Sequence, residues 1–221
     1  MITRVFFGAR RGDMTTQACL DHWRGTHAAI GASMPGVRAY VQNHGVLEGG
    51  RFLLPYPGFD IMPELDWDDL GAMDHAIDSP AHATDSVDDE ENFLDTSRTG
   101  YTVTERNVLH DGRPPEGAVK LITLFRRAPS ATPEALRDSL TGAYAEAVRP
   151  ADPLRHEVLL ALPDRQGRPP FAVQAIDVIW FAGPEDALAW TASEAAYRAA
   201  WTLSGVTFGC ERLIARPNKV V

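Results

Sequence analysis

The sequence has few cysteines, no long apolar run and no excess of positive charge. Its 221 residues include two cysteines, Cys19 and Cys210. Two are too few for a disulfide framework, so we expect a reducing, cytoplasmic location. No apolar stretch approaches the ~20 residues that span a bilayer. The formal net charge of −9 argues against nucleic acid or an anionic membrane as a partner, because both reward a basic surface.

Motifs that would indicate a nucleotide, a metal or a serine nucleophile are also missing. The sequence contains no Gly-x-Gly-x-x-Gly, Walker loop, Gly-x-Ser-x-Gly, Cys-x-x-Cys or His-Glu-x-x-His. His22 and His27 are five residues apart, which on an α-helix places them on different faces and gives no metal pair. We therefore expect no cofactor and no metal. A haem held by one histidine, or a metal held by distant histidines, stays open as an alternative.

An internal repeat organises the chain. Arg10 is matched by Arg126 and Asp60 by Asp177, at offsets of 116 and 117 residues. Between the copies lies a segment rich in glycine and proline, residues 110–117, with the composition of a linker. We expect two units, residues 1–110 and residues 118–221.

Each unit predicts the order β-α-β-β-α-β, which is the ferredoxin-like arrangement. A single sheet of this kind leaves one face bare, and a second sheet in the same chain would cover it. The predicted class is therefore α+β. In the first unit we expect strands at 4–9, 36–46, 59–65 and 101–109, helices at 15–33 and 68–77, and a short helix within 81–95. In the second we expect strands at 118–126, 154–162, 171–182 and 206–215, with helices at 132–147 and 184–203.

The first predicted helix places a histidine on an apolar face. Leu20, Trp23, His27 and Ile30 recur at steps of three and four residues, which marks one side of a helix. His27 on that side is either a hydrogen-bonded core residue or a proton-transfer group at the bottom of a pocket. Burial favours its neutral form, which is a competent general base.

Further candidates follow along the first unit. Tyr40 and His44 share the polar face of strand 36–46 and could orient a substrate oxygen if that face meets the cavity. The loop 47–58 has an apolar middle and could close over a pocket. The acidic run 85–91 indicates a solvated face.

A resemblance can be named on these residues. Arg10-Arg11, Thr16, Trp23, His27, Tyr40, Asp60, Phe93 and Glu105-Arg106 together resemble the EthD family of the dimeric α+β barrel superfamily. The resemblance implies that the two ferredoxin-like repeats form a pseudo-dimeric α+β barrel.

A second, partial match concerns the segment 79–82. Ser79-Pro80-Ala81-His82 is similar to the His-Pro-x-His segment of plant polyketide cyclases of the same superfamily. Their second histidine transfers a proton, and this makes His82 a candidate. Ser79 stands here in place of the first histidine.

The two copies differ in their titratable residues. Six of the seven histidines belong to the first copy, and His156 alone lies in the second. At the offset of 116 residues, His27 corresponds to Ala143 and Trp23 to Ser139. We therefore expect one active pocket, in the first copy, with the second copy closing the barrel.

The resulting hypothesis is a cofactor-independent lyase that acts on a small aromatic, phenolic or polyketide-like molecule by histidine acid–base catalysis. His27, His82, Tyr40 and His44 are the expected catalytic residues. Two alternatives stay open, a cofactor-free oxygenase of electron-rich aromatics and a non-enzymatic binding protein. A fused barrel needs no partner chain, although a homodimer is compatible with it. The expected contacts of the substrate pocket are Trp23, Phe7, Asp60 and Tyr56.

Overall fold

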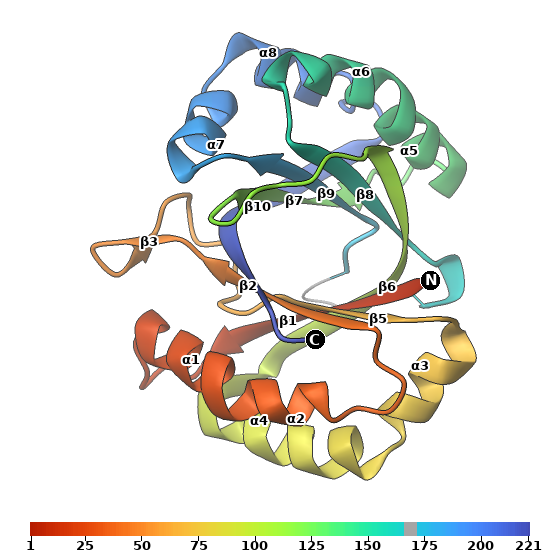
Figure 1. Ribbon diagram of the computed structural model, residues 1–221. Helices are drawn as coiled ribbons and strands as arrows, with labels where there is room; N and C mark the ends of the chain where they lie inside the picture. The colour runs from red at the N-terminus through yellow and green to blue at the C-terminus, as the bar shows by residue number, and fades with distance from the viewer. Residues whose placement is uncertain (166–171) are drawn as a thin grey trace.

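The computed structural model describes residues 1–165 and 172–221, and its centre is a closed antiparallel barrel of eight strands (Figure 1). A separate two-stranded hairpin, β3 (Leu47–Glu48) and β4 (Arg51–Phe52), projects from its side. The barrel strands are β1 (Ile2–Arg10), β2 (Ala39–Gly45), β5 (Pro63–Trp67), β6 (Leu94–His110), β7 (Val119–Arg127), β8 (Arg155–Ala161), β9 (Ala175–Phe181) and β10 (Thr207–Lys219).

The strand order confirms the duplicated ferredoxin-like unit. The first four barrel strands pair in the order β6-β1-β5-β2, and the last four in the order β10-β7-β9-β8. The two sheets join edge to edge, because β2 pairs with β10 and β6 pairs with β8. The pairing leaves neither sheet with a free edge and produces the predicted α+β barrel. We call the halves repeat one and repeat two.

Helices cover the outer face of each sheet, on opposite sides of the barrel (Figure 1). The predicted helix 15–33 begins after the N-cap Thr15, whose hydroxyl accepts a hydrogen bond from the Ala18 amide at 3.1 Å. Repeat one carries α1 (Thr16–His22), η1 (Trp23–His27), α2 (Ala28–Ala32), α3 (Leu70–Ile77), η2 (Ala81–Ser86) and α4 (Val87–Phe93). Repeat two carries α5 (Pro133–Ser139), η3 (Leu140–Tyr144), α6 (Ala145–Val148), α7 (Pro184–Thr191) and α8 (Glu194–Trp201), with short 3₁₀ turns η4 (Arg149–Ala151) and η5 (Pro163–Arg165).

Several predicted limits are corrected. The expected strand 59–65 starts later in the structure. Ile61 forms only an isolated bridge, with Gly8, and regular strand pairing begins at β5. The last strand of repeat one starts at Leu94, not at residue 101. The expected helix 184–203 is two helices, α7 and α8. The expected strand 171–182 begins at a residue outside the described part, and β9 covers the rest.

The inside of the barrel is apolar at one end and charged at the other. Aromatic and aliphatic side chains such as Phe7, Phe59 and Leu124 form the apolar part. The charged part, which we call the lumen ion cluster, consists of Glu64, Asp66, Arg106, Lys120 and Glu157. No helix in the described part of the chain is long and apolar enough to cross a membrane.

Candidate functional site

A small cavity lies between the first sheet and the helices that cover it. Its walls come from β1, β2 and β5 on one side and from η1, α2, η2 and α4 on the other. Its volume is about 30 Å³, which suits one or two water molecules. Its polar lining residues are Arg4, His27, Tyr40, His82, Ser86 and Glu90.

His27 is held by a carboxylate on the opposite helix. Its Nδ1 lies 2.9 Å from Oδ2 of Asp89, and Nε2 of His22 lies 3.0 Å from Oδ1 of the same side chain. The prediction that His22 and His27 lie on different helix faces is therefore wrong. The chain forms a π-helical turn at Trp23–His27, in which i→i+5 bonding brings residues five apart onto one side.

The geometry defines the protonation state of His27. Burial lowers the pKa of His27, and the hydrogen bond with Asp89 opposes this shift in part, so the ring is neutral near pH 7. A carboxylate at Nδ1 selects the tautomer with its hydrogen there. The lone pair is then on Nε2, which has no hydrogen-bond partner within the described residues, on a ring that lines the cavity.

Tyr40 ends a buried polar chain that reaches His44. The Gln42 amide nitrogen donates to the Tyr40 hydroxyl at 3.0 Å, and the Gln42 amide oxygen lies 3.0 Å from Nε2 of His44. Burial lowers the pKa of His44 to about 4 and raises that of Tyr40 to about 12. Because the Tyr40 oxygen accepts from Gln42, its own O–H is free to donate into the cavity.

The remaining wall adds a histidine, a carboxyl and a guanidinium. Nδ1 of His82 lies 3.1 Å from the Ile77 carbonyl oxygen, so Nδ1 donates and Nε2 keeps its lone pair. Burial lowers the pKa of His82 to about 4. Burial raises the pKa of Glu90 to about 7, although the positive charge of Arg4 opposes it. Glu90 is therefore partly protonated at neutral pH.

The other predicted pocket residues do not line this cavity. Trp23 packs against His44, with ring centroids 4.6 Å apart and the planes tilted by 36°, and neither residue is in the lining. Phe7 points into the barrel, where its ring centroid lies 5.3 Å from that of Phe59. Tyr56 donates to Asp60 at 2.7 Å. Tyr56 lines a separate cavity of about 570 Å³ beneath the loop 47–58.

Sequence reasoning missed the carboxylates of the site. The expected solvated face at 85–91 is wrong at Asp89, which is buried, and at Glu90, which is half-buried, whereas Asp85, Asp88 and Glu91 are exposed. One signal was available, because Ser86, Asp89 and Phe93 recur at steps of three and four and face the sheet together.

The comparison of the two copies also needs correction. The π-helical turns Trp23–His27 and Leu140–Tyr144 are equivalent, so His27 corresponds to Tyr144 and not to Ala143. Repeat two therefore keeps a titratable residue at this position. Among the described residues no group of three or more His, Cys, Asp or Glu side chains is arranged to hold a metal ion.

A family model matches the part of the chain that holds this cavity. Residues 11–97 match the model of the EthD domain. This part of the chain is similar to the EthD domain. The match includes the helices and strands that present His27, Tyr40, His82 and Asp89. No curated protein sequence matches the chain.

Solved structures extend the likeness to both repeats. An anthrone oxidase-like protein has a TM-score of 0.70 at 13% identity, over 99% of this chain and 92% of that one. A Fusobacterium nucleatum protein named "Putative monooxygenase" has a TM-score of 0.58 at 9% identity, over 99% and 93%. A mutant chlorite dismutase from Candidatus Nitrospira defluvii has a TM-score of 0.53 at 9% identity, over 99% and 92%. At these identities the likeness shows the fold, and it confirms the expected barrel for the whole chain.

Proposed function

We propose that the protein is an enzyme that removes a proton from a small hydroxylated substrate, with His27 as the general base. The observation that carries this proposal is the His27–Asp89 pair, in which Nδ1 is engaged at 2.9 Å and Nε2 is left for the substrate. The carboxylate orients the ring and stabilises the imidazolium that forms after proton transfer.

The neighbouring groups would act on the substrate oxygen and on the returning proton. Tyr40, whose oxygen already accepts from Gln42, would donate its O–H to the oxygen on which negative charge develops. Arg4 would add positive charge to the same wall. Glu90, with its pKa raised to about 7, would return a proton to the product. His82, which keeps a lone pair on Nε2, would accept a hydrogen bond from a substrate hydroxyl.

Substrate entry requires the cavity to open. A volume of about 30 Å³ does not accept an aromatic ring. One wall is the rigid sheet, and the other includes His82 on η2 and Glu90 on α4. We propose that η2 and α4 move away from the sheet when the substrate binds and return to exclude water.

The reaction that fits this arrangement best is that of a lyase: decarboxylation, dehydration, carbon–carbon cleavage or ring closure. Each begins or ends with proton transfer and needs an oxygen held by a donor, as Tyr40 would provide. The second candidate is an oxygenase of electron-rich aromatics, in which the deprotonated substrate reacts with oxygen. It is favoured by the names of two structures of the same fold, the anthrone oxidase-like protein and the monooxygenase.

The test is a pair of assays on the purified protein, with and without oxygen, against hydroxylated aromatic acids and alcohols, with products identified by mass spectrometry. A lyase gives a product lighter by carbon dioxide, water or formaldehyde, formed equally under nitrogen. A product heavier by oxygen and lost under nitrogen would identify an oxygenase. Tight binding without any product would indicate a carrier.

The residue assignment is tested with the active substrate. His27→Ala should lower kcat/KM by about 10²- to 10⁴-fold, and Asp89→Asn should lower it because the amide no longer favours the required tautomer. The matched control is His75→Ala, since His75 is exposed on α3 and should leave the rate unchanged. A folded His27→Ala protein with the full rate would contradict the assignment.

A further inference from the structure

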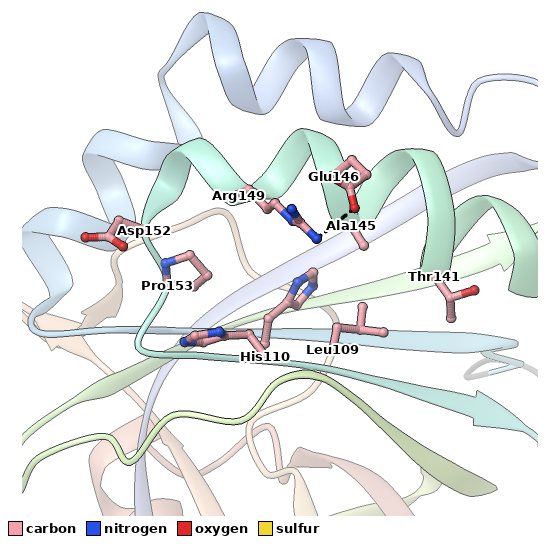
Figure 2. Close-up of a pocket in the computed structure, with 9 residues that line it drawn as sticks. Leu109, His110, Thr141, Ala145, Glu146, Arg149, Asp152 and Pro153 are labelled. Atoms are coloured by element: carbon pink, nitrogen blue, oxygen red, sulfur yellow. Dashed lines mark ion pairs between the residues drawn. The ribbon is translucent and has the colours of Figure 1, made fainter.

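Repeat two contains a larger cavity of its own. It lies between the helical segment η3–α6–η4 and the sheet strands β6 and β8, and its volume is about 360 Å³. In Figure 2 the helix carries Thr141, Ala145, Glu146 and Arg149 above, and the strand carries Leu109 and His110 below. The cavity has room for one aromatic ring, which the cavity at His27 lacks.

A buried histidine with a fixed orientation lines this cavity. Nε2 of His156 lies 2.7 Å from Oδ1 of Asp177, and the Tyr144 hydroxyl donates to Oδ2 of Asp177 at 2.8 Å. His156 is 3% exposed and Asp177 is fully buried. Burial and the charge of Asp177 raise the pKa of Tyr144, so this hydroxyl stays protonated as a donor.

The second ring nitrogen of His156 does not contact Asp177 and is available to a ligand. A carboxylate at Nε2 selects the tautomer with its hydrogen on Nε2, so Nδ1 carries the lone pair. Nδ1 has no hydrogen-bond partner in residues 1–165 and 172–221. This nitrogen is not among the buried side-chain atoms that lack a partner, so it keeps accessible surface on a residue that lines the cavity, and a ligand hydroxyl group could donate to it.

The strand register relates this histidine to the site in repeat one. Tyr40 pairs with Leu65, which pairs with Arg4, the third residue of β1. His156 pairs with Ile179, which pairs with Leu121, the third residue of β7. His156 therefore occupies the place of Tyr40.

The π-helical turns show that histidine and tyrosine have swapped positions between the two repeats. Tyr144 ends η3 as His27 ends η1. Repeat one has histidine on the turn and tyrosine on the strand, and repeat two has the reverse. The histidine–tyrosine pair between helices and sheet is thus present twice.

The charges around the cavity point to an uncharged ligand. Arg149 is paired with Glu146 at 3.0 Å, so its charge is already matched. Asp152 adds a further negative charge at the end of the helix (Figure 2), which disfavours an anion. Leu109 and Pro153 add apolar surface to the lining, which suits a ring.

We propose that repeat two holds a second ligand site, which takes a neutral hydroxylated aromatic molecule whose O–H donates to Nδ1 of His156. The site is independent of His27 and of the reaction proposed for repeat one. It makes the protein a two-site molecule, with one pocket in each helical layer.

The experiment uses phenol as the probe and anisole as its counterpart without a hydroxyl hydrogen. Binding to the full chain is followed by NMR, with the long-range nitrogen–hydrogen signals of the His156 ring as the local readout. Phenol should shift the Nδ1 signal of His156. Anisole should bind roughly tenfold more weakly, because it leaves Nδ1 unpaired.

Two tryptophan variants locate the binding. Ala145→Trp places a large side chain in the cavity and should weaken phenol binding about tenfold or more. Ala143→Trp is the matched control, because Ala143 is exposed on the same turn and outside the lining, and it should bind phenol as the natural protein does. His27→Ala should also bind normally.

Three results would overturn the proposal: phenol that leaves the His156 signals unmoved, anisole that binds as well as phenol, or binding that survives Ala145→Trp. Binding lost in His27→Ala but kept in Ala145→Trp would assign the probe to repeat one instead. Failure of the lyase or oxygenase assays leaves these measurements unaffected.

Discussion

The lumen ion cluster offers a test of how the two repeats are held together. Nζ of Lys120, on β7, lies 2.7 Å from Oε1 of Glu64, on β5, and both side chains are 3% exposed. Arg106 reaches Oε2 of Glu64 at 2.8 Å. These neighbouring cations hold the pKa of the Glu64 carboxyl well below its usual range. Lys120→Met removes one cation while keeping most of the side-chain volume.

The expected loss in free energy of unfolding follows from the burial of this ion pair. Removing one partner of a buried ion pair typically costs about 3 to 5 kcal/mol, since the remaining charge keeps its desolvation penalty. Because Arg106 remains beside Glu64, we expect the lower end, about 3 kcal/mol. For a chain of this size that corresponds to a fall in Tm of about 6 to 12 °C. The double variant Glu64→Gln/Lys120→Met removes both charges and should recover most of the loss.

The assay is urea unfolding of the single and double variants, followed by fluorescence, with the m-value checked for constancy. The matched control is Arg38→Met, since the ion pair between Arg38 and Asp68 is about 60% exposed on both sides and should leave the midpoint unchanged. The reasoning fails if Lys120→Met unfolds at the natural midpoint. It also fails if the double variant is less stable than Lys120→Met.

Two further predictions concern the cavity of repeat one. Gly31→Ala would place a Cβ 2.6 Å from Cε1 of Tyr40, so it should displace the ring and reduce kcat/KM. The control is Gly25→Ala, whose Cβ would meet nothing within 4 Å. Equal rates in both variants would exclude close packing against Tyr40 as the cause. With the active substrate, kcat/KM should fall at low pH as His27 gains a proton, with an apparent pKa below 6.5, and fall again above about pH 7 as Glu90 loses its proton. Glu90→Gln removes this proton donor, so it should lower the rate and abolish the second fall. An unchanged alkaline limb would remove Glu90 from the mechanism.

The fold was predictable because its signals are local and occur twice. Hydrophobic periodicity, the threonine N-caps and the repeated order of elements gave the ferredoxin-like unit, and duplication gave the barrel. The edge pairings β2–β10 and β6–β8 were not predictable, since they join strands far apart in the chain and depend on register. The shifted start of β5 was not predictable either, because Phe59 and Ile61 are more apolar than β5 itself, which contains Glu64 and Asp66.

The candidate site was predictable only in part. His27 was found from its helical spacing and Tyr40 from strand alternation, and both line one cavity. Asp89 was not found, because it is 62 residues from His27 in the sequence and lies in an acidic run. The π-helical turn was equally hidden, since a histidine pair at a spacing of five gives no signal on an α-helix. Phe7 was assigned to the pocket, although strand alternation sends Phe6 there and Phe7 into the barrel.

The two repeats differ in the element that carries the carboxylate bonded to the histidine. In repeat two Asp177 stands on β9, within the barrel itself, so the orientation of His156 does not depend on any helix movement. In repeat one Asp89 stands on α4, the helix that we propose moves for substrate entry. Opening would then separate Asp89 from His27, and closure would restore the tautomer that leaves Nε2 as the base. On this proposal the His27 pair would be active only in the closed state, when water is excluded.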